Sequence, residues 1–468
     1  MVIRLINIIL TIGLLTSCSQ NTKNLSQGNG STSIKSSNIK LNVKKYTLAN
    51  GLRVLLIENH NLPIFSYYTF FDVGGRFEGK GTTGATHFLE HMMFKGAKKY
   101  GPGKFDTIIE GNGGKTNAYT NFDSTVYYQS MPSRMLDTIL DLEADRMVDV
   151  LLEPKAFDSE RQVIFNERKM RYENSPRGKL YYGMMQSMFV DTPYGGSVIG
   201  SVEDLTSLKR DEVKDFYHRF YTPDNAIIVV VGDIDTSSTI KIVKEKFGQL
   251  KASSSEIKAY KAKKDLDSLY TLRTKFETKH VKINGSSTTP LFSIAYKGER
   301  LGAKRGFTMD IISSIIGSGE SSYFHQKYVK ARKPLLTSVY AANYQLKKNG
   351  VFYVGGELMK GVNLNRFRSQ FLRNASQICD KAITDRNVQK TKNQYLIDYY
   401  DELKTNAGVA HFVGNRENYF NDYGFYKKEL EIYNDITTEE AMRVCKDIFA
   451  SNKNIFISVW NKHPETKR

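Results

Sequence analysis

The sequence predicts an α+β protein of two domains, each a mixed or antiparallel sheet covered on one side by helices. The chain has 468 residues, of which 40% are hydrophobic and 25% charged, enough apolar material for two cores. Strand-like and helical runs follow each other in a similar order in both halves, which fits a duplicated unit. Between the halves, residues 251–274 are charged, serine-containing and aperiodic, which indicates a linker.

Residues 1–17 are typical of a bacterial lipoprotein signal peptide. Their apolar run, 5–15, is too short to span a bilayer as a permanent helix. It ends in LTSC, which resembles a lipobox whose cysteine, Cys18, is lipidated; an ordinary signal peptide cleaved nearby is the alternative. Ser19 does not resemble the aspartate that retains lipoproteins at the inner membrane. We therefore expect a lipid-anchored protein of the bacterial cell envelope, at the outer membrane and facing the periplasm.

The first domain is predicted to span residues 41–250, after a tether, 18–40, that is too rich in Ser, Asn and Gly to bury a core. LNVKKYTLANGLRVLLIEN contains two strand-like runs around Asn50-Gly51, a dipeptide that favours a tight hairpin turn. PIFSYYTFFDVGG is a further buried strand. The continuous apolar run 226–231 indicates a central strand that closes the domain.

The second domain is predicted to span residues 275–468, with strands at LFSIAYKG, in TSVYAANYQLKKNGVFYVGGEL and at NIFISVW, and a helix over 304–316. Its two cysteines, Cys379 and Cys445, lie in helical, partly apolar stretches. This setting favours buried free thiols, and a disulfide between them is left open.

The net charge of +18 could indicate a nucleic-acid partner, an anionic membrane or a lysine-rich proteome. The sequence contains no Arg/Lys-rich helix with interleaved aromatic residues and no nucleic-acid fold signature. We therefore expect no nucleic-acid partner.

The pentapeptide HFLEH places His87 and His91 four residues apart, on one face of a helix, so that both can reach a single ion. Zinc in a hydrolase keeps three protein ligands and one open position, and the adjacent Glu90 could serve as general base. With eight histidines in the chain, such a string arises by chance on the order of once in a hundred chains. The pattern therefore predicts a zinc site.

A third ligand is expected from the helix DSERQVIFNERKMRYE. Glu160 and Glu167 are seven residues apart, two helical turns, and so share a face. Either could reach the metal, and both could instead be solvated carboxylates near a helix start.

HFLEH, inverted relative to HExxH and followed 76 positions after His91 by Glu167, resembles the inverzincin family of insulysin, pitrilysin and mitochondrial processing peptidase. The resemblance covers most of residues 41–235. It extends to LANGLRVLLIENHNLP, VGGRFEGKGTTGATHFLEHMMFKG, GGKTNAYTNFDSTVYY, EADRM, ERQVIFNERKMRYENSP, PYGGSVIGSVEDL and FYTPDNAIIVVVGDID.

The resemblance implies one zinc ion per chain with the ligands His87, His91 and Glu167. It implies Glu90 as the general base and Glu160 as a carboxylate that orients a ligand. It also implies an edge strand that pairs with an extended substrate, formed here by Asn117, Ala118 and Tyr119. From the residues alone, a plain hairpin strand is the alternative.

The second half resembles the family only loosely. GSGESSYFHQKYVKARKPLLTSVYAANY is similar to the glycine-rich turn and following helix, but Tyr323 stands where an arginine is usual. Family members use an arginine and a tyrosine from this half to bind substrate and the tetrahedral intermediate. Arg332, Tyr340 and Tyr344 are unranked candidates for these roles.

Together these features predict a zinc-dependent endopeptidase that hydrolyses peptides or unfolded segments in a chamber. Family members of this length form half of a clam-shell, so we expect a homodimer or a heterodimer with a sister chain. The alternative is a catalytically silent peptide-binding or scaffold subunit of a cell-envelope complex.

Overall fold

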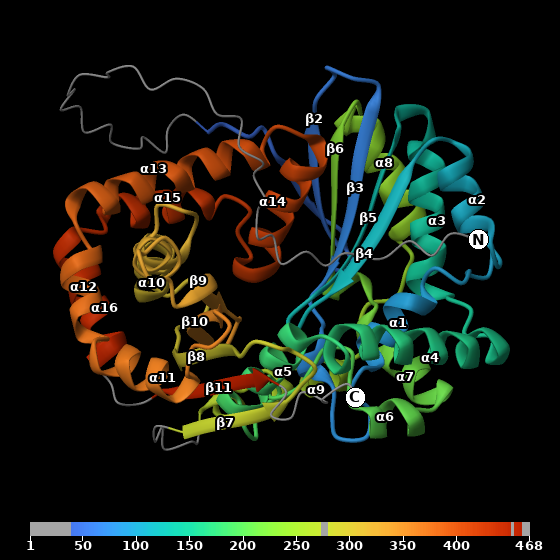
Figure 1. Cartoon of the computed structure of the whole chain (residues 1–468). Coiled ribbons are helices and arrows are strands. Elements are labelled where there is room, and N and C mark those ends of the chain that lie inside the picture. Colours follow the sequence, from blue (N-terminus) through green and yellow to red (C-terminus); the bar gives the residue numbers. More distant parts are fainter. Residues whose placement is uncertain (1–38, 273–278, 451–453, 461–468) are drawn as a thin grey trace.

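The structure, a computed structural model, describes residues 39–272, 279–450 and 454–460, which form two halves side by side (Figure 1). The signal peptide, Cys18 and nearly all of the predicted tether lie outside the described residues. Packing begins two residues before the predicted domain start. Ile39 is buried, and its carbonyl accepts a hydrogen bond of 3.1 Å from the Tyr426 hydroxyl.

The first half contains a six-stranded sheet. Its strands are β1 (Lys44–Thr47), β2 (Arg53–Glu58), β3 (Ile64–Phe71), β4 (Lys115–Thr120), β5 (Thr125–Pro132) and β6 (Ala226–Gly232), in the order β1-β2-β6-β3-β5-β4. The β1–β2 hairpin turns at Asn50-Gly51 as predicted, with a Gly51 φ of 86° that favours glycine. All of β6 is buried between β2 and β3, which confirms the central strand.

Helices of the first half cover one face of this sheet. They are α1 (Ala85–Met92), α2 (Lys104–Gly111), α3 (Leu136–Val148), α4 (Pro154–Arg168), α6 (Val202–Ser207), α7 (Arg210–Phe220) and α8 (Thr236–Phe247). Phe88 of α1 and Val213 of α7 share one core with Tyr67 of β3 and Val230 of β6. This core holds α1 against the sheet, and α1 also contacts β4.

The second half repeats the arrangement. Its strands are β7 (Lys279–Asn284), β8 (Leu291–Lys297), β9 (Leu336–Gln345), β10 (Gly350–Leu358) and β11 (Ile455–Trp460), in the order β7-β11-β8-β10-β9. Without β1, which is an addition to the first sheet, the two sheets have the same strand order. In each, the first strand (β2 or β7) pairs in parallel with the last (β6 or β11), and the second, fourth and third strands of that half follow. β4 and β9 are therefore equivalent edge strands, and the two sheets support a duplicated unit.

The helices of the second half are α10 (Lys304–Gly317), α11 (Leu364–Arg373), α12 (Ser376–Ala382), α13 (Asp385–Glu402), α14 (Asn406–Phe420), α15 (Tyr426–Asp435) and α16 (Thr438–Ala450). Among the described helices, none combines the length and the apolar character needed to cross a bilayer.

Each half also covers the second face of the other half's sheet with one helix. α14 packs against β3 and β6, and α5 (Pro176–Met188) packs against β8 and β11 (Figure 1). Phe70 and Val229 of the first sheet lie in one cluster with Phe412 of α14. Buried Glu417 of α14 is 2.8 Å from the Lys45 ammonium of β1. The two-domain α+β fold is thus confirmed. The prediction that helices cover one side of each sheet is corrected, because both faces are apolar and both are covered.

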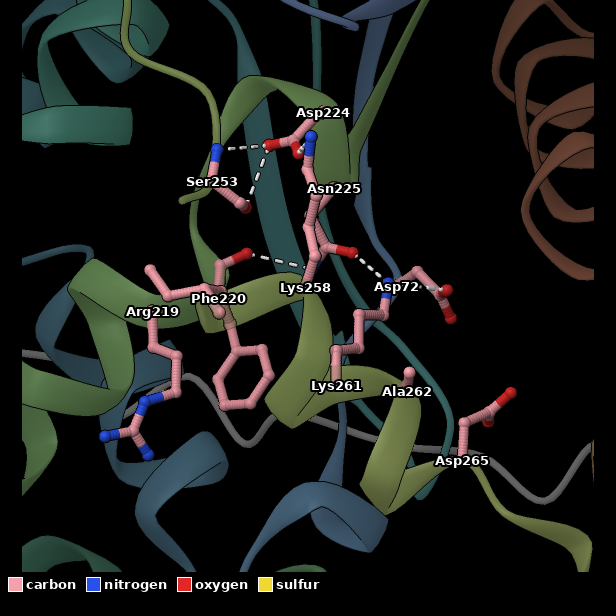
Figure 2. Close-up of a pocket in the computed structure, with 11 residues that line it drawn as sticks. Asp72, Arg219, Phe220, Asp224, Asn225, Ser253, Lys258, Lys261, Ala262 and Asp265 are labelled. Atoms are coloured by element: carbon pink, nitrogen blue, oxygen red, sulfur yellow. Dashed lines mark hydrogen bonds and ion pairs between the residues drawn. The ribbon is translucent and has the colours of Figure 1, made fainter. Parts of the chain in front are cut away.

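The predicted linker is not aperiodic throughout. Residues 255–264 form α9 (Ser255–Lys264), whose first turn is capped by Ser254, which accepts the Ile257 N–H at 3.2 Å. The Lys261 ammonium of α9 lies 2.9 Å from the Asp72 carboxylate, beside a cavity of about 350 Å³ (Figure 2). The charged residues of this segment favoured the prediction of a solvated linker. Instead, the Lys261 ion pair attaches the segment to the first half. Its last two residues, 273 and 274, lie outside the described chain.

Cys379 of α12 and Cys445 of α16 are fully buried, as expected, but the expectation of free thiols is wrong, because they form a disulfide. The two helices pack against each other in the core of the second half and bring the thiols together. Spacing in the sequence cannot reveal such proximity across 66 residues.

We expect replacement of both cysteines by alanine to lower the unfolding free energy of the second half by about 2–4 kcal/mol, because the crosslink restricts the unfolded chain. Trp460 of β11 is the only tryptophan of the chain, so its fluorescence in urea reports on this half. Equal unfolding midpoints for the variant and the oxidised wild type would contradict a stabilising disulfide.

Candidate active site

Helix α1 carries His87, Glu90 and His91, and its start is tightly constrained. Gly84 precedes it with a φ of 92°, and a Cβ there would lie 2.3 Å from the Ile199 carbonyl oxygen, so only glycine fits. The Glu78 carboxylate accepts the N–H groups of Gly84 (2.7 Å) and Thr86 (2.8 Å). A carboxylate at a helix N-terminus accepts hydrogen bonds from the free N–H groups there, and its negative charge interacts favourably with the positive end of the helix dipole.

Helix α4 faces α1 and brings two carboxylates to a single imidazole. Glu160 Oε1 lies 2.8 Å from His91 Nδ1, and Glu167 Oε2 lies 3.3 Å from His91 Nε2. Glu167 Oε2 is also 3.7 Å from His87 Nε2. The seven-residue spacing thus places both glutamates on one face, as predicted, with one on each nitrogen of His91. Ring stacking of Phe88 on Phe157, with centroids 4.2 Å apart, holds the helices in this position.

The side chains of His87, His91 and Glu167 fit a metal ion. Each offers one ligand atom, and these atoms lie within 4.8 Å of one another. His91 Nε2 is buried and has no hydrogen bond in the described structure, because its contact with Glu167 is not aligned for one. Two imidazoles and a carboxylate are a donor set that zinc accepts in hydrolases. Glu160 on the other nitrogen of His91 would orient that ligand.

The electrostatics of the three candidate ligands suit a cation. Burial lowers the pKa of His87 to about 3, so its imidazole is neutral. Burial opposes the charge on Glu167, but contacts with His91, His87 and Arg171 outweigh it and lower the pKa to about 2. Burial also opposes charge on His91, yet Glu160 and Glu167 raise its pKa to about 9. A bound cation would take the place of the His91 proton.

Glu90 lies on the side of α1 that faces β4. Its carboxylate is only 5% exposed and accepts a hydrogen bond from the hydroxyl of Thr120, the last residue of β4. Burial raises the pKa of Glu90, while His91 and Thr120 lower it. A carboxyl group with a raised pKa exchanges protons more readily near neutral pH.

Asn117, Ala118 and Tyr119 lie in β4, at the outer edge of the first sheet, where β5 alone among the described strands pairs with β4. The Ala118 N–H donates to the side chain of Asn117 at 2.9 Å. The Tyr119 hydroxyl lies 3.3 Å from His411 Nε2 of α14.

The second-half candidates lie apart from this group. Tyr340 and Tyr344 are on β9 and pack, partly buried, on the side covered by α5, while Arg332 is exposed before β9. Among the described residues, no hydrogen bond or ion pair links any of the three to the ligand set. The structure therefore brings together His87, Glu90, His91, Glu160 and Glu167, and it leaves the three second-half residues as candidates.

Three residues that contact the candidate site escaped the sequence analysis. The Arg171 guanidinium lies 2.7 Å from Glu167 Oε1, and the Lys95 ammonium lies 2.7 Å from Glu160 Oε2. Arg171 comes four residues after Glu167, and Lys95 comes four residues after His91. This spacing is that of neighbours on a helix and could have indicated Arg171 and Lys95. No sequence signal indicates the hydroxyl of Thr120 as the partner of Glu90.

We expect Glu160→Gln to weaken zinc binding about 10- to 100-fold, because the amide cannot match the carboxylate on His91 Nδ1. Competition with a chelator of known affinity measures the change. The matched control is Glu173→Gln. It breaks the 2.8 Å ion pair between Glu173, which lies in the turn after α4, and Arg168, the last residue of α4. Equal zinc affinities of Glu160→Gln and wild type would contradict the orienting role.

Comparison with known proteins gives concordant matches over both halves. Residues 53–201 match the family model described as insulinase (peptidase family M16), and residues 207–395 match the peptidase M16 inactive domain. The zinc protease PqqE of Helicobacter pylori is 27% identical over 413 residues, which cover 87% of this chain and 90% of that protein. The beta subunit of mitochondrial-processing peptidase from Dictyostelium discoideum is 23% identical over 446 residues, which cover 92% of this chain and 91% of that protein. The crystal structure of a protease from Helicobacter pylori is similar in fold, with a TM-score of 0.81 at 24% identity over 90% of this chain and 100% of that chain.

Proposed function

Because the chain belongs to peptidase family M16, the insulinase family, we propose that it is a zinc-dependent endopeptidase that cuts peptides or unfolded polypeptide segments. The observation that carries the proposal is the convergence of His87, His91 and Glu167 within 4.8 Å, with the buried carboxyl group of Glu90 on the helix of the two histidines. Relatives named as zinc proteases support it.

In this proposal His87, His91 and Glu167 hold one zinc ion per chain. When bound, zinc supplies a Lewis acid that polarises the scissile carbonyl and makes water more acidic. Glu90 takes a proton from the attacking water and returns it to the leaving amine. The hydroxyl of Thr120 holds the Glu90 carboxylate in place for both transfers. Glu160, itself paired with Lys95, keeps the His91 ring oriented.

The free edge of β4 is the proposed place for the substrate. An extended peptide can add to an exposed strand edge through main-chain hydrogen bonds, which do not depend on its sequence. Within the segment Asn117, Ala118 and Tyr119, the main-chain groups that point away from β5 would supply these bonds. β4 ends at Thr120, beside Glu90. A peptide bound there would pass the general base.

Cleavage of a mixed library of unstructured peptides tests the proposal. The purified protein, with and without a chelator, is incubated with the library, and the products are identified by mass spectrometry. We expect internal cleavage that the chelator abolishes. The protein tested should be fully loaded with zinc, and its mass in solution should be known. If the peptides then remain intact, the result would instead favour a catalytically silent peptide-binding or scaffold subunit.

We also propose that the protein works as a dimer, either of two copies or with a sister chain, so that the second member completes the chamber. The relative from Dictyostelium discoideum is named as a subunit, which supports this expectation. The mass of the purified protein in solution tests it, because a single-chain mass at full activity would overturn it.

For location, we propose the cell envelope, with a lipid on Cys18 that anchors the chain at the outer membrane. The lipobox-like LTSC supports this location. The disulfide of the second half agrees, because disulfides persist in oxidising compartments outside the cytosol. A Cys18→Ser variant should leave the membrane fraction, and its retention there would contradict the lipid anchor.

A further inference from the structure

Two equivalent turns of the duplicated fold meet where the halves join. The β9–β10 turn of the second half places the Lys347 N–H 3.1 Å from Asp123 Oδ2, in the β4–β5 turn of the first half. The Lys347 ammonium lies 3.0 Å from Asp72, the residue after β3. Asp123 is buried, accepts the Tyr194 hydroxyl at 2.8 Å and lies 2.9 Å from the buried guanidinium of Arg76. The turn after β4 is thus anchored in a buried ionic cluster that the second half completes.

Helix α14 of the second half contacts the same strand and turn. The Tyr419 hydroxyl lies 3.4 Å from both Asn121 Nδ2 and Ser124 Oγ, in the turn after β4. Within β4 itself, the Tyr119 hydroxyl lies 3.3 Å from His411 Nε2. His411 Nδ1 lies 2.9 Å from the Glu402 carboxylate. In Figure 1, α14 lies beside the strands of the first sheet, in agreement with its packing on β3 and β6.

These contacts matter because β4 is an edge strand with one neighbour, β5, in the described part of the sheet. Strands with few partners are among the parts of a protein that open at low free energy. The same strand ends in Thr120, whose hydroxyl holds the Glu90 carboxylate. Any shift of β4 therefore reaches both the free edge and Glu90.

We propose that the second half positions β4 for catalysis, with Lys347, His411 and Tyr419 as positioning residues that do not touch the substrate. The part that concerns substrate rests on the proposed peptidase function, whereas the ordering of β4 does not. Among the described residues, the only group that could hold a metal is in the first half. The proposal thus gives the second half a role in the reaction without a metal site of its own.

Two variants and two matched controls test the proposal. Tyr419→Phe removes the hydroxyl that lies 3.4 Å from Asn121 and Ser124 in the turn after β4. Lys347→Met keeps the main-chain N–H on Asp123 but removes the ammonium that holds the β9–β10 turn on Asp72. Tyr433→Phe removes a phenol that bonds Asp310 at 3.0 Å inside the second half. Lys348→Met removes an ammonium that pairs with Asp265 (3.1 Å) and Asp267 (2.9 Å) of the segment between the halves. The controls lose the same chemical groups without loss of a side-chain contact to the turn after β4 or to Asp72.

Hydrogen–deuterium exchange of the intact protein gives a readout that does not depend on activity. We expect amides of residues 115–124 to exchange at least about threefold faster in Tyr419→Phe, since a lost hydrogen bond contributes roughly 1 kcal/mol. They should also exchange faster than in the wild type in Lys347→Met, because the β9–β10 turn then holds Asp123 through its main chain alone. Residues 85–92 should exchange at the wild-type rate in all four variants. Unchanged exchange of 115–124, or an equal rise in the controls, would overturn the proposal.

Steady-state kinetics test the link to the reaction. We expect Tyr419→Phe and Lys347→Met to raise the KM of an unstructured peptide about 3- to 10-fold at unchanged zinc content, and the controls to keep the wild-type KM. Tyr419→Phe should also lower kcat, and this effect should vanish in a Thr120→Val background, because both changes act through the hydrogen bond to Glu90. Effects on kcat that multiply would instead show general loosening and would overturn the proposal.

A conservative replacement provides a rescue. His411→Leu should raise KM, whereas His411→Gln keeps a polar partner for the Tyr119 hydroxyl and should restore most of the wild-type KM. Equal values for the two variants would contradict positioning through this contact. If exchange responds as expected but no form cleaves peptides, the peptidase proposal fails and the ordering of β4 by the second half stands.

Discussion

Glu90→Gln is expected to lower peptide cleavage by about 10²- to 10⁴-fold while the protein keeps its zinc. Glutamine has nearly the shape of glutamate and can still accept the Thr120 hydroxyl, but it cannot take up a proton from water. His87, His91 and Glu167 are untouched, so the metal site should persist. Turnover of an unstructured peptide, compared at equal zinc content, measures the effect.

The matched control is Glu203→Gln, which removes a carboxylate from the exposed part of α6. This variant should cleave at the wild-type rate. Undiminished turnover by Glu90→Gln, in a preparation free of contaminating protease, would show that Glu90 is not the general base.

Glu167→Gln is expected to weaken zinc binding by more than about 100-fold, the upper limit usual for a residue that only supports a ligand. The charged oxygen that lies 3.3 Å from His91 and 3.7 Å from His87 would be replaced by a neutral amide. Two neutral imidazoles then remain of a set of three ligands. Zinc content after dialysis against a mild chelator, together with peptide turnover, measures the loss.

Comparison with Glu160→Gln separates a ligand from a residue that orients one. Both variants lose a carboxylate from the same face of α4, and both glutamates contact His91. Glu167→Gln should therefore lose more zinc than Glu160→Gln at every chelator concentration. The opposite order would assign the third ligand to Glu160.

Much of the fold could be predicted from local patterns. The apolar run of β6 and the Asn50-Gly51 turn indicate a buried central strand and a hairpin, because each depends on neighbouring residues alone. The crossing of α5 and α14 to the opposite sheets could not be predicted, since an apolar helix face does not specify which sheet it covers. The pairing of Cys379 with Cys445 was undetermined for the same reason, as spacing gives no distance.

The site shows the same division between local and distant contacts. The spacing of His87 and His91 predicts a shared helix face, and that of Glu160 and Glu167 predicts another. The spacing of the histidines also predicts their zinc site, whereas the separate roles of Glu160 and Glu167 were assigned only through the family resemblance. The structure adds which nitrogen of His91 each glutamate contacts. Thr120 reaches Glu90 across 30 residues of chain, and nothing in a Thr at the end of a strand indicates that contact.

The central claim is that one zinc ion, held by His87, His91 and Glu167, is required for peptide hydrolysis. The most direct test is to remove zinc with a chelator, return it in steps, and measure bound zinc and peptide turnover in the same samples. The account predicts that turnover rises in proportion to bound zinc and reaches its plateau at about one zinc per chain. Full turnover by the zinc-free protein, or no turnover at one zinc per chain, would contradict it.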